Sequence, residues 1–97
     1  EAEDILSRIA FATMAPESTI SVAGHTDDVP ISGGLYRDNW DLAAARASTV
    51  VQAIQNTGLV SPDRMKAISY GESKPKADNT SDTGREQNRR IEIEIDF

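Results

Sequence analysis

The apolar residues of this chain recur with two different periods, which predicts both helices and strands. In residues 3–13 and 39–57 they return every three or four positions, the spacing of an amphipathic helix. The stripe in the second segment consists of Trp40, Ala43, Ala44, Ala47, Val50, Val51 and Ile54. Asp38 or Asn39 can cap its first turn, and Gly58 follows its end. We expect Trp40 to pack in the core, because it belongs to this stripe.

A period of two, typical of strands, occurs in other segments. These are residues 18–24, 65–70 and 90–97. In the last of them, the apolar residues would face one way and the acidic residues between them the other. The apolar set is Ile91, Ile93, Ile95 and Phe97. With a short polar helix over 82–89, the order predicts an α+β sandwich: a βαβαβ-type core with helices packed on one face of a small mixed sheet.

Length and charge restrict the class of protein. A chain of 97 residues is one domain, here a leading helix within 1–17 and a core over 18–97. Its apolar runs are far shorter than the ~20 residues of a membrane span. The net charge is −6, so the chain lacks the basic balance that nucleic-acid binding requires. The absence of cysteine excludes disulfides, a thiolate zinc site and a Cys nucleophile. The chain begins with Glu1, not Met, and we expect it to be part of a longer protein.

A long polar loop over 25–38 is the first place to look for a site, since loops of more than ~12 residues are often functional. It opens with His25, Thr26, Asp27 and Asp28. A metal-dependent hydrolase built on this cluster would need further ligands, and the chain has 1 His. We therefore predict no metal site and no catalytic residue. We expect His25 to end its strand and to hydrogen-bond locally.

Asp27 and Arg46 suggest a different chemistry. Asp27 follows a predicted strand and Arg46 lies inside the long helix. A carboxylate and a guanidinium held apart can bind a zwitterion, the first by its ammonium and the second by its carboxylate. A salt bridge between the two, joining loop to helix, is the alternative, and spacing leaves both open. Arg89 and Arg90 pose the same choice between anion recognition and pairing with acids.

Motifs along the chain resemble the OmpA-like peptidoglycan-binding family. In order, they are Gly24-His25-Thr26-Asp27, Asn39-x-x-Leu42-Ala43-x-x-Arg46-Ala47, Tyr70-Gly71-Glu72-Ser73-x-Pro75 and Gly84-Arg85-x-x-Asn88-Arg89-Arg90-Ile91. The resemblance covers roughly residues 18–95. Within the family, Asp28-x-Pro30-Ile31 and Asn39-Trp40-x-Leu42 are most similar to the periplasmic domain of flagellar stator B subunits, of the MotB or PomB type. Ala43 stands where many members carry Ser, and the first strand of the family fold is expected to be missing.

The resemblance implies non-catalytic binding of peptidoglycan, without a cofactor, at the diaminopimelate centre of the stem peptide. By position, Asp27 would take the ammonium and Arg46 the carboxylate. The pocket would be lined by Thr26, Asn39, Leu42 and Ala43, mainly through backbone and shape, and Arg89 is the further binding residue.

The resemblance also implies a place in the cell. By this resemblance, the chain would be a periplasmic domain of a protein that an upstream helix anchors in the inner membrane. That protein would work as a homodimer together with a stator A subunit. The wall would then hold the stator while ion flow generates torque. The alternative is a wall tether of an outer-membrane protein or lipoprotein with no motor role.

Overall fold

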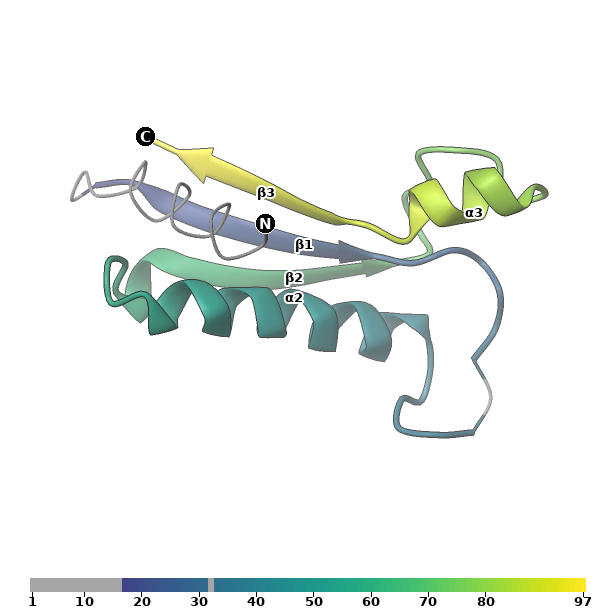
Figure 1. The fold of residues 1–97 in the computed structure, drawn as a ribbon, viewed down its shortest axis with the longest axis horizontal. Helices are drawn as coiled ribbons and strands as arrows, with labels where there is room; N and C mark the ends of the chain where they lie inside the picture. Colours follow the sequence, from purple (N-terminus) through teal and green to yellow (C-terminus); the bar gives the residue numbers. More distant parts are fainter. Residues whose placement is uncertain (1–16, 32) are drawn as a thin grey trace.

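The strands form one mixed sheet. The computed structural model describes residues 17–31 and 33–97, so the predicted leading helix lies outside the described residues. The strands are β1 (Thr19–His25), β2 (Met65–Gly71) and β3 (Ile91–Asp96), in the spatial order β2-β1-β3 (Figure 1). The central strand β1 runs parallel to β2 and antiparallel to β3. The predicted α+β fold with a small mixed sheet is confirmed.

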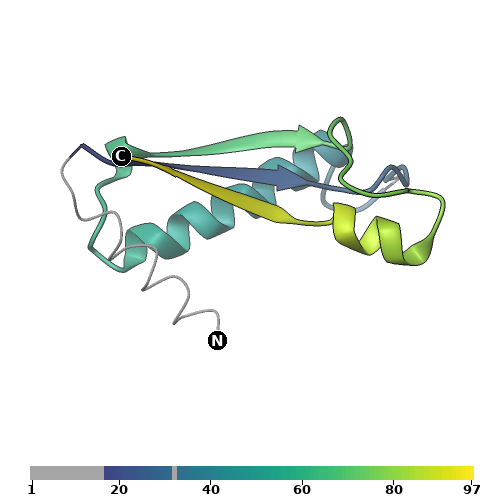
Figure 2. The same cartoon turned by 90° about the horizontal axis from the view of Figure 1, so that it is seen from above.

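Helix α2 (Asn39–Asn56) connects β1 to β2 and lies against these two strands, on one face of the sheet (Figure 2). It begins where the sequence predicts, because the carboxylate of Asp38 accepts a hydrogen bond of 2.9 Å from the Asp41 N–H. It ends shortly before Gly58, whose φ of 76° suits glycine. A 3-10 turn, η1 (Pro62–Arg64), then leads into β2. Within residues 17–31 and 33–97, no helix has the length and apolar character of a membrane span.

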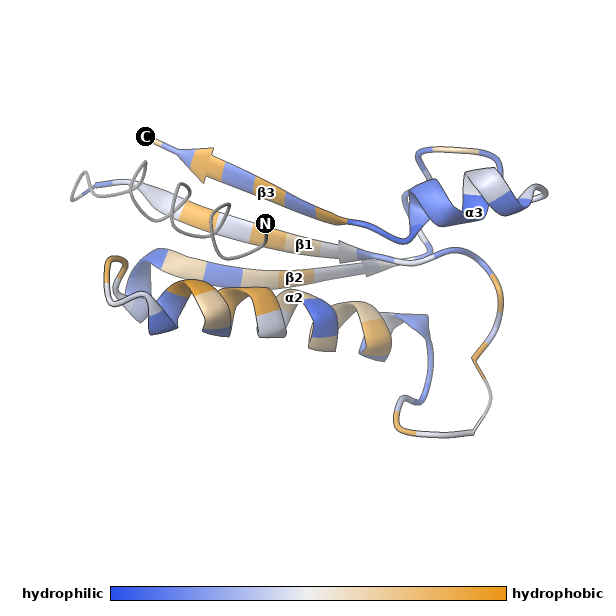
Figure 3. Ribbon diagram, in the orientation of Figure 1, coloured by the Kyte–Doolittle hydropathy of each residue, from blue (hydrophilic) through white to orange (hydrophobic). Residues whose placement is uncertain are grey.

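The core fills the space between α2 and the sheet. Its buried side chains are Ile20, Val22, Ala47, Ile54 and Val60. The alternating apolar and polar residues of β3, visible as orange and blue bands in Figure 3, match the predicted pattern. The isoleucines of β3 are half-buried against the core, and the acidic residues between them are exposed. Phe97, which the pattern grouped with the isoleucines, lies beyond the end of β3 and is 73% exposed.

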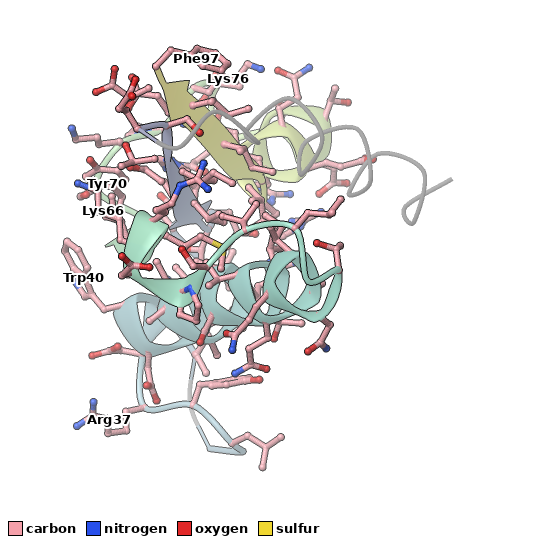
Figure 4. The ribbon with its side chains drawn as sticks, turned by 90° about the vertical axis from the view of Figure 1, so that its left-hand side faces the viewer. Arg37, Trp40, Lys66, Tyr70, Lys76 and Phe97 are labelled. Atoms are coloured by element: carbon pink, nitrogen blue, oxygen red, sulfur yellow. The ribbon has the colours of Figure 1, made fainter. Side chains whose placement is uncertain are left out.

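Trp40 does not pack in the core as predicted: it is 51% exposed. Figure 4 shows it on the same side of the molecule as Tyr70 and Lys66, pointing away from α2. The reason is that its neighbour Asn39 takes the buried position in the first turn. One turn later the backbone of α2 approaches β1 closely, since a Cβ added to Gly24 would lie 2.2 Å from the carbonyl oxygen of Ala43.

Helix α3 (Asp82–Asn88) lies beyond the end of the sheet where β1 and β2 end (Figure 1). Its last residue, Asn88, is fully buried and holds the preceding loop in place. The Oδ1 atom of Asn88 accepts hydrogen bonds of 2.8 Å from the N–H groups of Lys76 and Ala77. Its Nδ2 atom donates to the Ala77 carbonyl at 3.0 Å. These bonds fix the end of α3, where Arg89 follows.

Candidate functional site

The predicted site residues gather at the end of the sheet where β1 and β2 end and α2 begins (Figure 1). The backbone N–H of Thr26, just after β1, donates to the carbonyl of Gly71 at the end of β2, at 2.8 Å. The hydroxyl of Thr26 donates to the carbonyl of Asp27, also at 2.8 Å. Thr26 and Asp27 are both buried. The turn that carries Asp27 therefore follows β1 directly and is hydrogen-bonded to the end of β2. These contacts hold the turn in one conformation.

The Asp27 carboxylate is fixed by two neighbours. Its Oδ1 atom accepts a hydrogen bond of 3.1 Å from the Val29 N–H, and its Oδ2 atom accepts one of 2.7 Å from Nη1 of Arg89. The side chain of Asp27 is 13% exposed and that of Arg89 is 44% exposed. The ion pair at Asp27 is thus made with Arg89, from the end of α3, and not with Arg46.

Asn39, the first residue of α2, joins the segments of the site. Its Nδ2 atom lies 3.3 Å from the Asp27 carbonyl, 3.1 Å from the Val29 carbonyl and 3.0 Å from Oε1 of Glu72. The side chain is buried. Asn39 therefore connects the loop after β1, the start of α2 and the loop after β2.

Glu72 was missing from the predicted site residues. The signal that could have found it is its place directly after β2, because the carboxyl ends of parallel strands meet at one edge of a sheet. Asp27 follows β1 at the same edge.

Arg46 lies further along α2, one helical turn after Ala43. It is exposed, and in the part of the chain that the structure describes its guanidinium makes no ion pair or hydrogen bond. Ala43 is fully buried against Gly24, and Leu42 is half-buried. The structure thus brings Asp27, Asn39 and Arg89 into contact, with Thr26 beside them, and leaves Arg46 open to solvent.

His25 ends β1, as predicted, but its side chain does not hydrogen-bond locally. It is 2% exposed, and neither ring nitrogen has a hydrogen-bond partner among the described residues. The ring stacks on Tyr70 with centroids 5.3 Å apart, and Nε2 lies 3.4 Å from Oε1 of Glu92. Burial is the main cause that lowers the pKa of His25, and the positive charge of Arg90 adds to it.

The cluster that begins with His25 does not assemble into a metal site. Asp28 is exposed, while His25 and Asp27 are buried. Across residues 17–31 and 33–97, no three His, Asp or Glu side chains are arranged so that they could hold a metal ion.

Comparison with known proteins places the chain in a family. The sequence profile of the OmpA family matches residues 1–89. Outer membrane porin F of Pseudomonas fluorescens is 38% identical over 93 residues, which are 96% of this chain and 27% of the porin. Peptidoglycan-binding protein ArfA of Mycobacterium bovis is 32% identical over 93 residues, 95% of this chain and 27% of ArfA.

A solved structure agrees with the sequence comparisons. The C-terminal domain of Helicobacter pylori MotB superimposes with a TM-score of 0.87 at 32% sequence identity, covering 98% of this chain and 73% of that one. The chain spans only 27% of the length of the porin and of ArfA. The match to the family profile over residues 1–89 shows that the chain belongs to the OmpA family.

Proposed function

We propose that this domain binds peptidoglycan without covalent chemistry, by gripping the diaminopimelate centre of the stem peptide. The proposal is carried by one arrangement: Asp27, a fixed carboxylate in the turn after β1, and Arg46, an exposed guanidinium on α2 that makes no ion pair or hydrogen bond within the described residues. The free end of diaminopimelate carries an ammonium and a carboxylate, which these two groups complement. Membership of the OmpA family and the similarity to the peptidoglycan-binding protein ArfA support peptidoglycan as the ligand.

The roles of the two charged residues follow from their surroundings. Asp27 receives the ammonium, and because Val29 and Arg89 already hold its carboxylate, little conformational freedom is lost on binding. Each carboxylate oxygen still has room for a further donor, since a carboxylate offers about four acceptor positions. Arg46 receives the ligand carboxylate through two parallel hydrogen bonds.

The remaining pocket residues act by shape and by backbone position. Thr26 and Asn39 hold the turn around Asp27, and Leu42 and Ala43 form the wall of α2 beside it. The side chain of Ala43 is fully buried against Gly24, so this residue contributes through the backbone position of α2. Arg89 orients Asp27.

In the cell, we assign the domain to the periplasm, where it anchors a flagellar stator to the wall so that ion flow generates torque. The similarity to the Helicobacter pylori MotB domain supports this role, as do Asp28 and Pro30 in the loop and Trp40 in the first turn of α2. The partners would be a stator A subunit and a second copy of the same protein. Paired domains on a repeating polymer make a weak site sufficient, because the second contact is intramolecular.

A wall tether of an outer-membrane protein or lipoprotein is the second candidate, and the similarity to porin F favours it. A motility experiment separates the two. The chain would replace the periplasmic domain of a stator B subunit in a strain that lacks its own. Restored swimming supports the motor role. A fusion that is held by the wall but gives no swimming supports the tether.

Co-sedimentation with purified peptidoglycan tests the binding itself. The parent chain and Lys66→Ala should pellet with the wall, since Lys66 is an exposed cation at the far end of β2. Asp27→Ala and Arg46→Ala should remain in the supernatant while circular dichroism shows the parent fold. If both of these variants pellet like the parent, the proposed site is wrong.

A further inference from the structure

Glu72 contributes a carboxylate to the site, and the proposed function gives it no role. Its Oε1 atom accepts a hydrogen bond of 3.0 Å from Nδ2 of Asn39. The side chain is exposed, and its carboxylate has no other partner in the described part of the chain. Glu72 therefore presents an anionic oxygen to solvent. It does so next to the buried Asn39, whose Nδ2 atom also contacts the Asp27 carbonyl.

Asp27, in contrast, is already paired with a cation. The guanidinium of Arg89 lies 2.7 Å from its Oδ2 atom, so the two charges largely cancel at this position. An incoming ammonium meets a nearly neutral ion pair at Asp27. Glu72 forms no ion pair within the described residues. It therefore supplies the net negative charge that the pair of Asp27 and Arg89 lacks.

Asn39 connects Glu72 to the turn that carries Asp27. Its Nδ2 atom lies within hydrogen-bond distance of the carbonyls of Asp27 and Val29 and of the carboxylate of Glu72. Because the Asp27 carbonyl also accepts from the Thr26 hydroxyl, the two Nδ2 hydrogens suffice for Val29 and Glu72. The Glu72 carboxylate is thus held beside the turn of Asp27, while its Oε2 atom has no hydrogen-bond partner among the described residues.

We infer that Glu72 is a second carboxylate of the ammonium subsite and determines its preference for a free, charged amine. The ammonium is shared between Asp27 and Glu72, with Asn39 between them. This inference rests on the proposed function and extends it from the pair Asp27 and Arg46 to three charged residues. It identifies the preferred ligand as the unsubstituted amino acid end of a stem peptide, because acylation of that amine removes its charge.

A titration with diaminopimelic acid, followed by the amide signals of the isotope-labelled 97-residue chain, tests the inference. Glu72→Gln keeps an oxygen that accepts from Asn39 and removes the charge, whereas Glu72→Ala removes both. Glu94→Gln is the matched control, since Glu94 is exposed on β3 and its carboxylate forms no ion pair or hydrogen bond in the described part of the chain. Glu72→Gln should weaken binding about tenfold at low salt. The difference should shrink at 1 M salt, where exposed charges are screened.

The outcomes distinguish this inference from the proposed function. If Glu72→Gln binds like the parent while Asp27→Ala does not, Glu72 only positions Asn39 and the inference is overturned, whatever Glu72→Ala does. If Glu72→Gln loses affinity and Glu94→Gln does not, the inference is supported. If the parent itself does not bind, or if Asp27→Ala and Arg46→Ala bind like the parent, the proposed function fails and the inference fails with it.

Discussion

The guanidinium of Arg89 lies 2.7 Å from the Oδ2 atom of Asp27, although 62 residues separate them in the chain. The sheet order explains this contact. Because β3 lies beside β1 and runs antiparallel to it, the residues before β3 meet the residues after β1. A backbone hydrogen bond joins the same two segments, since the His25 N–H donates to the Arg90 carbonyl at 2.9 Å. The motifs at the two ends of the core thus form one site.

Removing the Arg89 side chain should destabilise the domain modestly. Arg89→Ala leaves the buried Asp27 carboxylate with the Val29 N–H alone, but Arg89 is itself 44% exposed, so solvent screens the pair. We expect the free energy of unfolding to fall by about 1 kcal/mol, with a smaller loss at 1 M salt. Chemical denaturation measures it. Arg37→Ala is the control, because the Arg37 side chain is 88% exposed and 3.7 Å from Asp41. If Arg89→Ala and Arg37→Ala lost the same free energy of unfolding, the ion pair between Asp27 and Arg89 would add nothing specific to stability.

Asn88→Ala should be considerably more damaging. Asn88 is fully buried and its amide satisfies the N–H groups of Lys76 and Ala77, which would be left without partners. We expect a loss of about 2–4 kcal/mol in the free energy of unfolding. Hydrogen exchange should also speed up at the Lys76 and Ala77 amides. Gln87→Ala, an exposed position in the same helix, serves as the control. Unchanged exchange in Asn88→Ala would show that the loop does not depend on this side chain.

The buried His25 gives a pH dependence with a definite sign. Burial lowers its pKa in the folded state below the ordinary value of about 6.5. Between the two values the unfolded chain binds more protons than the folded one, so stability rises with pH in that window. Stability should therefore be full above about pH 6.5 and fall as the pH drops below it.

A comparison of melting temperatures between pH 8 and pH 5.5 measures this effect. His25→Phe keeps an aromatic ring against Tyr70 and removes the titration. Its curve should be flatter than that of the parent. Glu92 does not interfere in this range, because the hydrogen bond from Arg90 lowers its pKa further below neutrality. Parallel curves for the parent and His25→Phe would show that His25 does not titrate as its burial requires.

Local patterns in the sequence were sufficient for the fold. The alternation in β3 and the capping residues Asp38 and Gly58 are signals that act within a few residues, and the structure reproduces them. Trp40 was misplaced because periodicity cannot distinguish the edge of an apolar stripe from its centre. The centre is set by where α2 approaches Gly24, a contact between distant segments.

The site could be predicted only in part, for a similar reason. Asp27 was singled out because it follows a predicted strand, whereas Asn39 was named as a pocket residue only through the resemblance to the family. The partner of Asp27 could not be chosen from the sequence, since both Arg46 and Arg89 have the right charge and only the sheet order brings Arg89 close. Glu72 was missed because its contact with Asn39 joins the loop after β2 to the start of α2, 33 positions away in the sequence.

Recognition of a zwitterion by Asp27 and Arg46 is the central claim, and a titration of parent and Arg46→Ala with diaminopimelic acid tests it most directly. In the parent, amide signals of Asp27 and of the first two turns of α2 should shift and saturate. In Arg46→Ala they should no longer saturate over the same ligand range, while the remaining spectrum stays that of the folded domain. Equal binding by the two proteins, or shifts confined to β2 and β3 away from Asp27, would contradict the claim.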